Sequence, residues 1–156
     1  MDLSRRAVLA AAGAAAALAA IPNQKSSGQV QREDSLAGWH PANGHLMTRW
    51  SRDVSPNNVW PEYPRPQLVR ERWLNLNGLW NYQITDKDQT HIPGIHAGKI
   101  MVPFGIESAM SGVMKPLLPH QRLWYQRDVI IPDSWHGQSV LLHFGAVDWE
   151  ATVYID

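Results

Sequence analysis

The chain ends with the stretch that decides its fold, Val147-Asp148-Trp149-Glu150-Ala151-Thr152-Val153-Tyr154-Ile155-Asp156. Its odd-numbered positions are apolar, whereas its even-numbered positions carry Asp, Glu, Thr, Tyr and Asp. Successive side chains of a β-strand point to opposite faces of the sheet, so this alternation predicts a half-buried strand. We expect the odd-numbered face to be buried and the face that includes Glu150 to be exposed to water.

Shorter segments toward the N-terminus also have strand character. They are residues 78–84, 99–103, 124–131 and 139–144. In the first of them Trp80, Tyr82 and Ile84 share one face, and the apolar run of the last predicts burial on both faces. Short strands separated by turn residues predict an all-β antiparallel sandwich. Because the chain stops at the end of its last strand without a hairpin partner, we expect this sandwich to be incomplete at its C-terminus.

The composition excludes several classes of function. The 156 residues suffice for one domain but not for a domain plus a catalytic barrel. Lys and Arg together number 14, as do Asp and Glu, so no excess of charge indicates binding to nucleic acid or to an anionic membrane. The chain has no cysteine, which excludes disulfides, thiolate metal sites and a cysteine nucleophile.

Residues 1–30 differ from the rest of the chain. Arg5 and Arg6 stand directly before an alanine-rich apolar run, and Ala17-Leu18-Ala19 offers a small-residue cleavage site. This layout predicts a twin-arginine-type signal peptide, a periplasmic or extracellular location and no membrane contact after cleavage. The alternative is a membrane anchor, although the run is shorter than the roughly 20 residues that a spanning helix needs.

Residues 31–63 form the predicted connection between this signal and the sandwich. They begin as a polar, aperiodic linker and continue as a proline-rich lead-in, which we expect to be extended and irregular. Trp39, Trp50 and Trp60 stand among the prolines. These indoles either anchor the lead-in to the domain surface or stack on a sugar ring.

The remaining residues, 64–156, carry family-like segments. They are Pro64-Arg65-Pro66-Gln67-Leu68-Val69-Arg70, Trp73-Leu74-Asn75-Leu76-Asn77-Gly78-Leu79-Trp80, Val102-Pro103-Phe104-Gly105-Ile106-Glu107-Ser108, Leu123-Trp124-Tyr125-Gln126-Arg127, and the stretch from Phe144 to Asp156. In this order they resemble the N-terminal part of family 2 glycoside hydrolases, which include β-galactosidases, β-glucuronidases and β-mannosidases.

The resemblance implies a galactose-binding-like jelly-roll β-sandwich, truncated here before its last strands. In the family, an immunoglobulin-like sandwich and a TIM barrel follow, and the barrel supplies two glutamates for hydrolysis with retention of configuration. That mechanism needs two carboxyl groups about 5–5.5 Å apart. Since the barrel is missing from this sequence, we expect no catalytic residue, no cofactor and no independent activity. The implied partners are a β-galactoside or related glycan and the missing downstream domains.

Three residues are candidates for a substrate rim, because the corresponding loop can approach the barrel mouth in complete family members. Glu107 and Ser108 lie in the loop after Val102-Pro103, and we place Trp124 with them. The alternative for Glu107 is a loop carboxylate that caps backbone donors. No spacing of the histidines indicates a metal site.

These observations leave three functional hypotheses. The first is a non-catalytic, carbohydrate-binding-like domain of an exported glycoside hydrolase. The second is a free-standing exported carbohydrate-binding module, and the third is an interaction domain that docks onto a separate barrel by strand addition.

Overall fold

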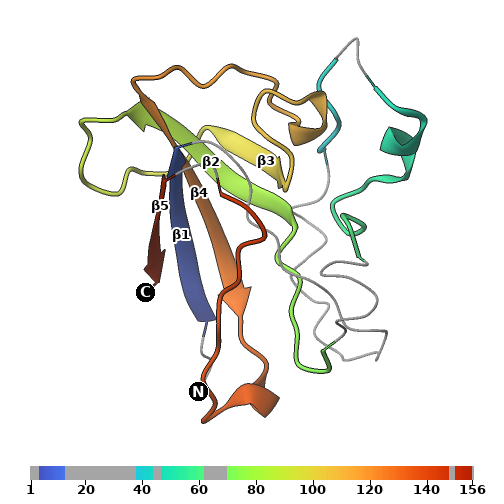
Figure 1. Cartoon of the computed structure of the whole chain (residues 1–156), viewed down its shortest axis with the longest axis vertical. Coiled ribbons are helices and arrows are strands. Elements are labelled where there is room, and N and C mark those ends of the chain that lie inside the picture. The colour runs from blue at the N-terminus through green and yellow to red at the C-terminus, as the bar shows by residue number, and fades with distance from the viewer. Residues whose placement is uncertain (1–3, 13–37, 44–46, 62–69, 148–149, 156) are drawn as a thin grey trace.

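The computed structural model describes residues 4–12, 38–43, 47–61, 70–147 and 150–155. Their strands form one five-stranded sheet in the order β3-β2-β4-β1-β5, and every neighbouring pair is antiparallel (Figure 1). The strands are β1 (Ser4–Ala12), β2 (Gly78–Asp86), β3 (Gly98–Val102), β4 (Gln121–Ile130) and β5 (Glu150–Ile155). The all-β class predicted from the sequence is therefore confirmed.

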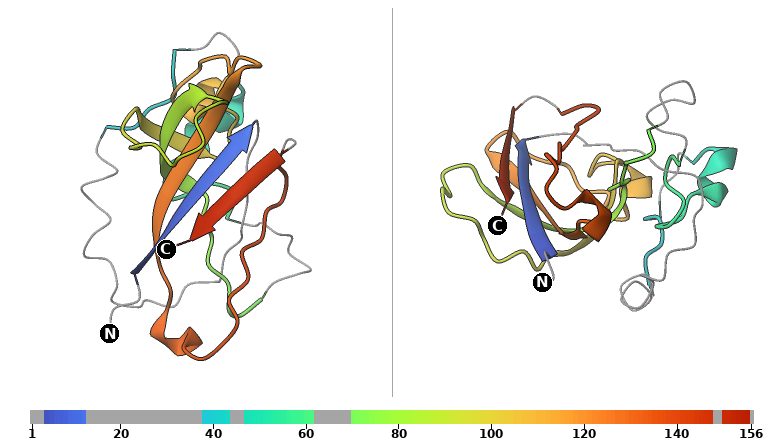
Figure 2. Two further views of the ribbon diagram at one scale, coloured as in Figure 1. Left: turned by 90° about the vertical axis from the view of Figure 1, so that its left-hand side faces the viewer. Right: turned by 90° about the horizontal axis from the view of Figure 1, so that it is seen from below.

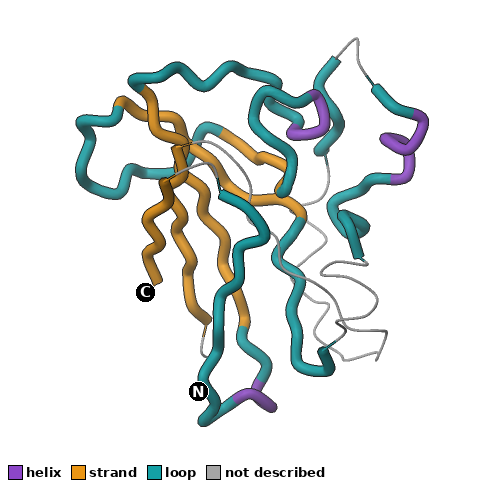
Figure 3. The backbone as a smooth tube through the Cα atoms, in the orientation of Figure 1, coloured by secondary structure: helices purple, strands orange, loops and turns teal. Residues whose placement is uncertain are grey.

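Helical structure in the described residues is limited to short 3-10 turns, coloured purple in Figure 3. They are η1 (Arg49–Asp53), η3 (Ala109–Ser111) and η4 (Asp133–Trp135). None of the helices found in the described ranges is long and apolar enough to cross a membrane.

The larger of two hydrophobic clusters lies on one face of the β3-β2-β4 part of the sheet, and a smaller one, around Trp124, lies on the other. Trp80 and Tyr82 of β2 belong to the larger cluster, and Ile84 packs against it, which confirms the face predicted for that strand. The other buried members of this cluster are Ile100, Val102, Ile106, Leu123 and Tyr125. Trp80 and Tyr125 meet edge to face with their ring centroids 6.5 Å apart, a favoured arrangement for an aromatic pair.

The strand predicted over residues 139–144 is absent, and that prediction was wrong. This segment follows η4 as an irregular connection that pairs with no strand of the described sheet. Val140 is 47% exposed and Leu141 is 67% exposed. An apolar run favours a strand only where a neighbouring strand can complete its hydrogen bonds, and composition does not supply that neighbour.

The last strand lies at an edge of the described sheet, and its odd-numbered face is exposed rather than buried as predicted. Val153 and Ile155 are exposed, whereas Tyr154 packs against the buried Trp124. The exposed position of Glu150 agrees with the prediction. The segment after β4 lines a cavity together with Ile155 but does not close over this face, so Val153 and Ile155 keep 38% and 59% of their surfaces exposed.

Part of the predicted signal segment belongs to the sheet. The backbone of β1 pairs with β4 on one side, where Arg5 and Arg6 stand opposite Val129 and Asp128, and with β5 on the other. Figure 2 shows β1 in blue between these two strands. The remainder of residues 1–30, including the predicted cleavage site, lies outside the described residues. The export signal itself therefore stays a prediction.

Candidate functional site

The loop between β3 and β4 carries the predicted rim residues Glu107 and Ser108. It starts with a cis peptide bond between Val102 and Pro103, includes η3, and ends in the turn that precedes β4 (Figure 1). Ile106 of this loop is 3% exposed and belongs to the main hydrophobic cluster. The loop is therefore packed against the sheet rather than free in solvent.

Ser111 organises the backbone of this loop from a fully buried position. Its Oγ lies 2.7 Å from the carbonyl oxygen of Ser108 and 3.1 Å from that of Ile106. The same oxygen accepts hydrogen bonds from the backbone N–H groups of Val113 and Met114, at 3.0 and 3.3 Å. One hydroxyl thus satisfies several backbone groups that this irregular loop would otherwise leave unpaired.

The two predicted rim residues in the loop hold backbone donors. The Oγ of Ser108 accepts a hydrogen bond from the N–H of Met110 at 3.1 Å and caps η3. The Oε1 of Glu107 accepts one from the N–H of Leu117 at 3.3 Å. For Glu107 this is the capping role that the sequence left open as the alternative. Its side chain is nevertheless exposed, so a ligand has access to the carboxylate.

Trp124 does not lie at an open rim. Its side chain is fully buried in β4, and its indole N–H donates to the Oγ1 of Thr85 at 2.8 Å. Tyr154 stacks on it with ring centroids 6.2 Å apart. A buried indole with a satisfied donor has no free face for a sugar, so this position corrects our placement of Trp124 beside Glu107 and Ser108.

Glu107 also influences the phenol of Tyr125 in β4. Burial of Tyr125, followed by the negative charge of Glu107, raises the pKa of this phenol above its ordinary value. Both effects disfavour the phenolate, because a buried anion loses hydration and a second negative charge repels it. Tyr125 is therefore a neutral core residue and not a general base at neutral pH.

The lead-in is fastened to this loop through Trp39. A Cβ added to Gly112, whose φ is +80°, would lie 2.5 Å from the Nε1 of Trp39, so only glycine leaves room for the indole. Next to this contact, the N–H of Ala42 donates to the carbonyl oxygen of Ala109 at 2.9 Å. Trp39 thus serves as an anchor, which was one of the two roles that we considered for it.

The other two tryptophans of the lead-in are less enclosed. Trp60 meets the ring of Phe104 edge to face at 6.3 Å but keeps 47% of its surface exposed. Trp50 is 61% exposed, with the Arg49 guanidinium 4.4 Å from the centre of its ring. Trp50 has the most accessible indole surface of these three.

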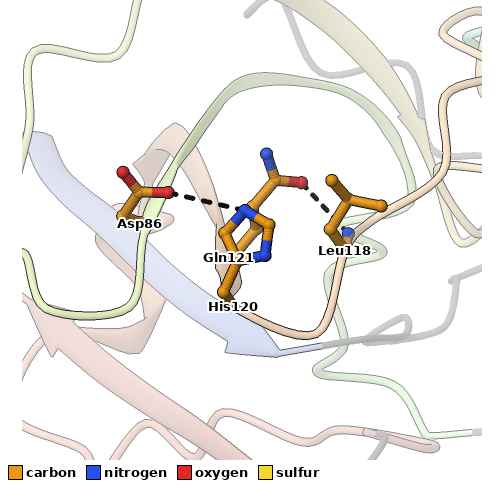
Figure 4. A network of polar contacts seen from close by, with 4 residues as sticks. All are labelled: Asp86, Leu118, His120 and Gln121. Carbon is orange, nitrogen blue, oxygen red and sulfur yellow. Dashed lines mark hydrogen bonds and ion pairs between the residues drawn. The ribbon is translucent and has the colours of Figure 1, made fainter.

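The far end of the loop is closed by polar contacts at the surface (Figure 4). The N–H of Leu118 donates to the side-chain oxygen of Gln121 at 3.0 Å. His120 and Asp86 approach to 3.9 Å, with both side chains largely exposed. A single exposed pair of this kind contributes at most about 1 kcal/mol, and it marks a turn rather than a reactive centre.

Two of the family-like segments meet in space. The Nη1 of Arg127 in β4 donates to the carbonyl oxygens of Leu76 and Asn77, at 2.6 and 3.0 Å. The same guanidinium lies 5.9 Å from the centre of the Trp80 ring. The segments 73–80 and 123–127 are therefore joined by one arginine, and nothing in their separation along the sequence indicates this contact.

No group of three or more histidine and carboxylate side chains in the described part of the chain could hold a metal ion. A comparison of the sequence with models of known protein families finds no match, and a comparison with curated protein sequences finds none either. The residues of the site therefore carry the functional argument themselves.

Proposed function

We propose that the chain is a non-catalytic, galactose-binding-like jelly-roll domain of an exported glycoside hydrolase. In this proposal the domain supports a catalytic barrel and carries Glu107 on a packed loop that faces the substrate entrance. The substrates are β-galactosides or related O-glycosides, and the reaction takes place in the barrel. Arg5 and Arg6 belong to the export signal, and the mature protein acts in the periplasm or outside the cell.

The observation that carries the proposal is the contact between family-like segments through Arg127. If the family-like segments belong to one domain, they should contact one another. The guanidinium of Arg127 donates to the backbone of Leu76 and Asn77 and lies near the Trp80 ring. The loop that carries Glu107 packs against the same core through Ile106. Three of the family-like segments, 73–80, 102–108 and 123–127, thus contribute to this part of the sheet.

The non-catalytic role is supported by the state of Glu107. Glycoside hydrolysis with retention needs a second carboxyl group about 5–5.5 Å from the first. Among the described residues, the carboxylate of Glu107 accepts from the backbone N–H of Leu117, and its charge acts on the buried phenol of Tyr125. Neither of these neighbours is the second carboxyl group that the mechanism needs.

An exported interaction domain is the second candidate, favoured by the open edge and face of β5. Val153 and Ile155 are exposed on this strand, which ends the described sheet. An edge strand with apolar side chains is suited to pairing with a strand of a separately encoded barrel. A free-standing carbohydrate-binding module remains the third candidate, with Trp50 as its most accessible indole.

Chromogenic substrates test the central statement directly. Purified full-length chain should release no nitrophenol from nitrophenyl β-galactoside, β-glucuronide or β-mannoside above the rate of a heat-treated sample. Hydrolysis that disappears in Glu107→Gln and persists in the matched exposed variant Glu71→Gln would overturn the non-catalytic role.

Unfolding in urea separates the three candidates. A supporting domain should unfold at the same urea concentration with and without galactosides, because it gains affinity only beside its barrel. A free-standing module should shift to higher urea in the presence of sugar, since a ligand that binds only the native state stabilises it. Concentration-dependent association without a sugar effect would favour the interaction domain.

A further inference from the structure

A cavity of about 700 Å³ lies beside the end of β4, well within the size range of small-molecule sites. One wall is the chain that leads into β2, including Arg72 and Trp73. The irregular segment after β4, including Trp135, Gln138 and His143, also lines the cavity and touches the first segment through the Arg72–Gln138 and Trp73–His143 contacts. Residues 139–143 of this segment belong to the stretch for which the sequence predicted a strand.

Aliphatic side chains and two tryptophans line most of the cavity. The rings of Trp73 and His143 lie with centroids 5.4 Å apart and planes tilted by 32°, and the guanidinium of Arg70 lies 5.6 Å from the centre of the Trp73 ring. Trp135, in η4, is half-buried and also lines the cavity. Flat apolar surfaces of this kind suit the face of a six-membered ring.

The polar groups around the cavity are predominantly hydrogen-bond donors. Arg70 and Arg72 line it, and none of its described lining residues is Asp or Glu. Arg72 donates through Nη1 to the side-chain oxygen of Gln138, which fixes both side chains and leaves further N–H groups on each. A guanidinium with free N–H groups matches the two oxygens of a carboxylate.

We propose that this cavity binds a small cyclic carboxylate, that is, one carboxylate carried on a six-membered ring. Arg72, oriented by Gln138, binds the carboxylate, and Trp135 packs against the ring. The ring belongs either to a sugar acid or to an aromatic acid, because both present a flat apolar face and one negative charge. This site is separate from the Glu107 loop, so the proposal that it binds a carboxylate does not depend on the proposed function.

Two matched ligand pairs test the proposal by isothermal titration calorimetry on the full-length chain. The first pair is glucuronate and glucose, and the second is benzoate and benzamide, so each pair differs in its charged group on a similar ring. We expect at least one acid to bind about tenfold more tightly than its neutral partner, a typical effect of a charge-assisted bidentate contact. The pair that shows this preference identifies the ring.

Variants connect that preference to the cavity. Arg72→Gln should remove it, and Arg72→Lys should keep only part of it, because an ammonium group lacks the planar fork. Trp135→Leu should weaken the binding of the preferred acid severalfold. Arg49→Gln is the matched control, since Arg49 is also exposed and lies over the ring of Trp50 in the lead-in, outside the cavity lining.

Three results would overturn the proposal. They are the absence of binding by either acid, equal binding of acid and neutral partner in both pairs, and an acid preference that survives in Arg72→Gln. Because Arg72 is exposed, its variants should unfold at the urea concentration of the parent chain, which separates a lost site from a lost fold.

Discussion

The two ends of the sheet use similar apolar residues with opposite results. At the β3-β2-β4 end, Ile100 and Val102 have 0% and 3% of their surfaces exposed, because the loop that follows β3 covers them. At the β5 end, Val153 and Ile155 are 38% and 59% exposed. The difference lies in the covering layer and not in the strands. A strand pattern thus sets which side chains share a face, whereas a segment outside the strand decides whether that face is buried.

The largest expected effect comes from truncating the most deeply buried aromatic side chain of the sheet, which lies on the face opposite the main cluster. Trp124→Ala should lower the free energy of unfolding by about 3–5 kcal/mol, because it removes a fully buried indole and leaves a cavity. Urea unfolding followed by circular dichroism measures the loss. Trp50→Ala is the control and should change stability by less than about 0.5 kcal/mol, because Trp50 is 61% exposed. Equal losses would mean that Trp50 is covered in solution.

A second test concerns the anchor between the loop and the lead-in. Gly112→Ala should cost about 2–4 kcal/mol, because it adds both backbone strain at φ +80° and a collision 2.5 Å from the Nε1 of Trp39. Gly137→Ala has nearly the same φ of +76° but nothing within 4 Å of the new Cβ. It should cost only about 1 kcal/mol by thermal or urea unfolding. Similar costs for both variants would exclude a tight contact at Gly112.

A third test removes the hydroxyl that organises the covering loop. Ser111→Ala should lower the free energy of unfolding by about 1–2 kcal/mol, since the N–H groups of Val113 and Met114 lose their acceptor. Ser139→Ala, at an exposed position, should leave stability within about 0.5 kcal/mol of the parent chain. Hydrogen exchange at Val113 should accelerate only in the first variant.

A fourth test uses alkaline pH. Because the folded chain raises the pKa of Tyr125, the stability due to its neutral phenol is complete below the unfolded pKa of about 10. That stability is lost as pH rises above this value, since the unfolded chain releases the proton first. Between pH 9 and pH 11 the free energy of unfolding should therefore fall more for the parent chain than for Tyr125→Phe. Parallel curves for the two proteins would contradict the burial of this phenol.

The smallest effect is expected at the uncovered end. Ile155→Ser should change the free energy of unfolding by less than about 0.5 kcal/mol, because its side chain is 59% exposed. A loss above about 1.5 kcal/mol in urea unfolding would show that another layer covers β5 in solution. Repeating the measurement over a range of protein concentrations distinguishes cover by the same chain from association of two copies.

The sequence predicted the strands of the covered end well, because their patterns and bounding prolines and glycines are local. The face of Trp80, Tyr82 and Ile84 is confirmed, and β2, β3 and β4 lie within a few residues of their predicted ranges. The exposure of Val153 and Ile155 was missed, because alternation along one strand contains no information about a covering layer.

The candidate site was less predictable than the strands. Glu107 and Ser108 were found by resemblance, but their roles depend on the backbone donors of Leu117 and Met110, which only the folded loop brings near. Ser111 gives no sequence signal at all, since its importance comes from burial and from its four backbone neighbours. Trp124 was misplaced because a sequence does not distinguish a surface indole from a core indole.

The position of β1 has a consequence for maturation. If the proposed export signal is cleaved after Ala19, the strand that lies between β4 and β5 leaves with it. The backbone N–H and C=O groups of β4 and β5 that faced β1 then need new hydrogen-bond partners. If β4 and β5 pair directly with each other, β5 has to move by one strand spacing, about 4.8 Å. The precursor and the mature protein would therefore contain different sheets. Because cleavage of the signal is irreversible, this change of conformation would be irreversible too.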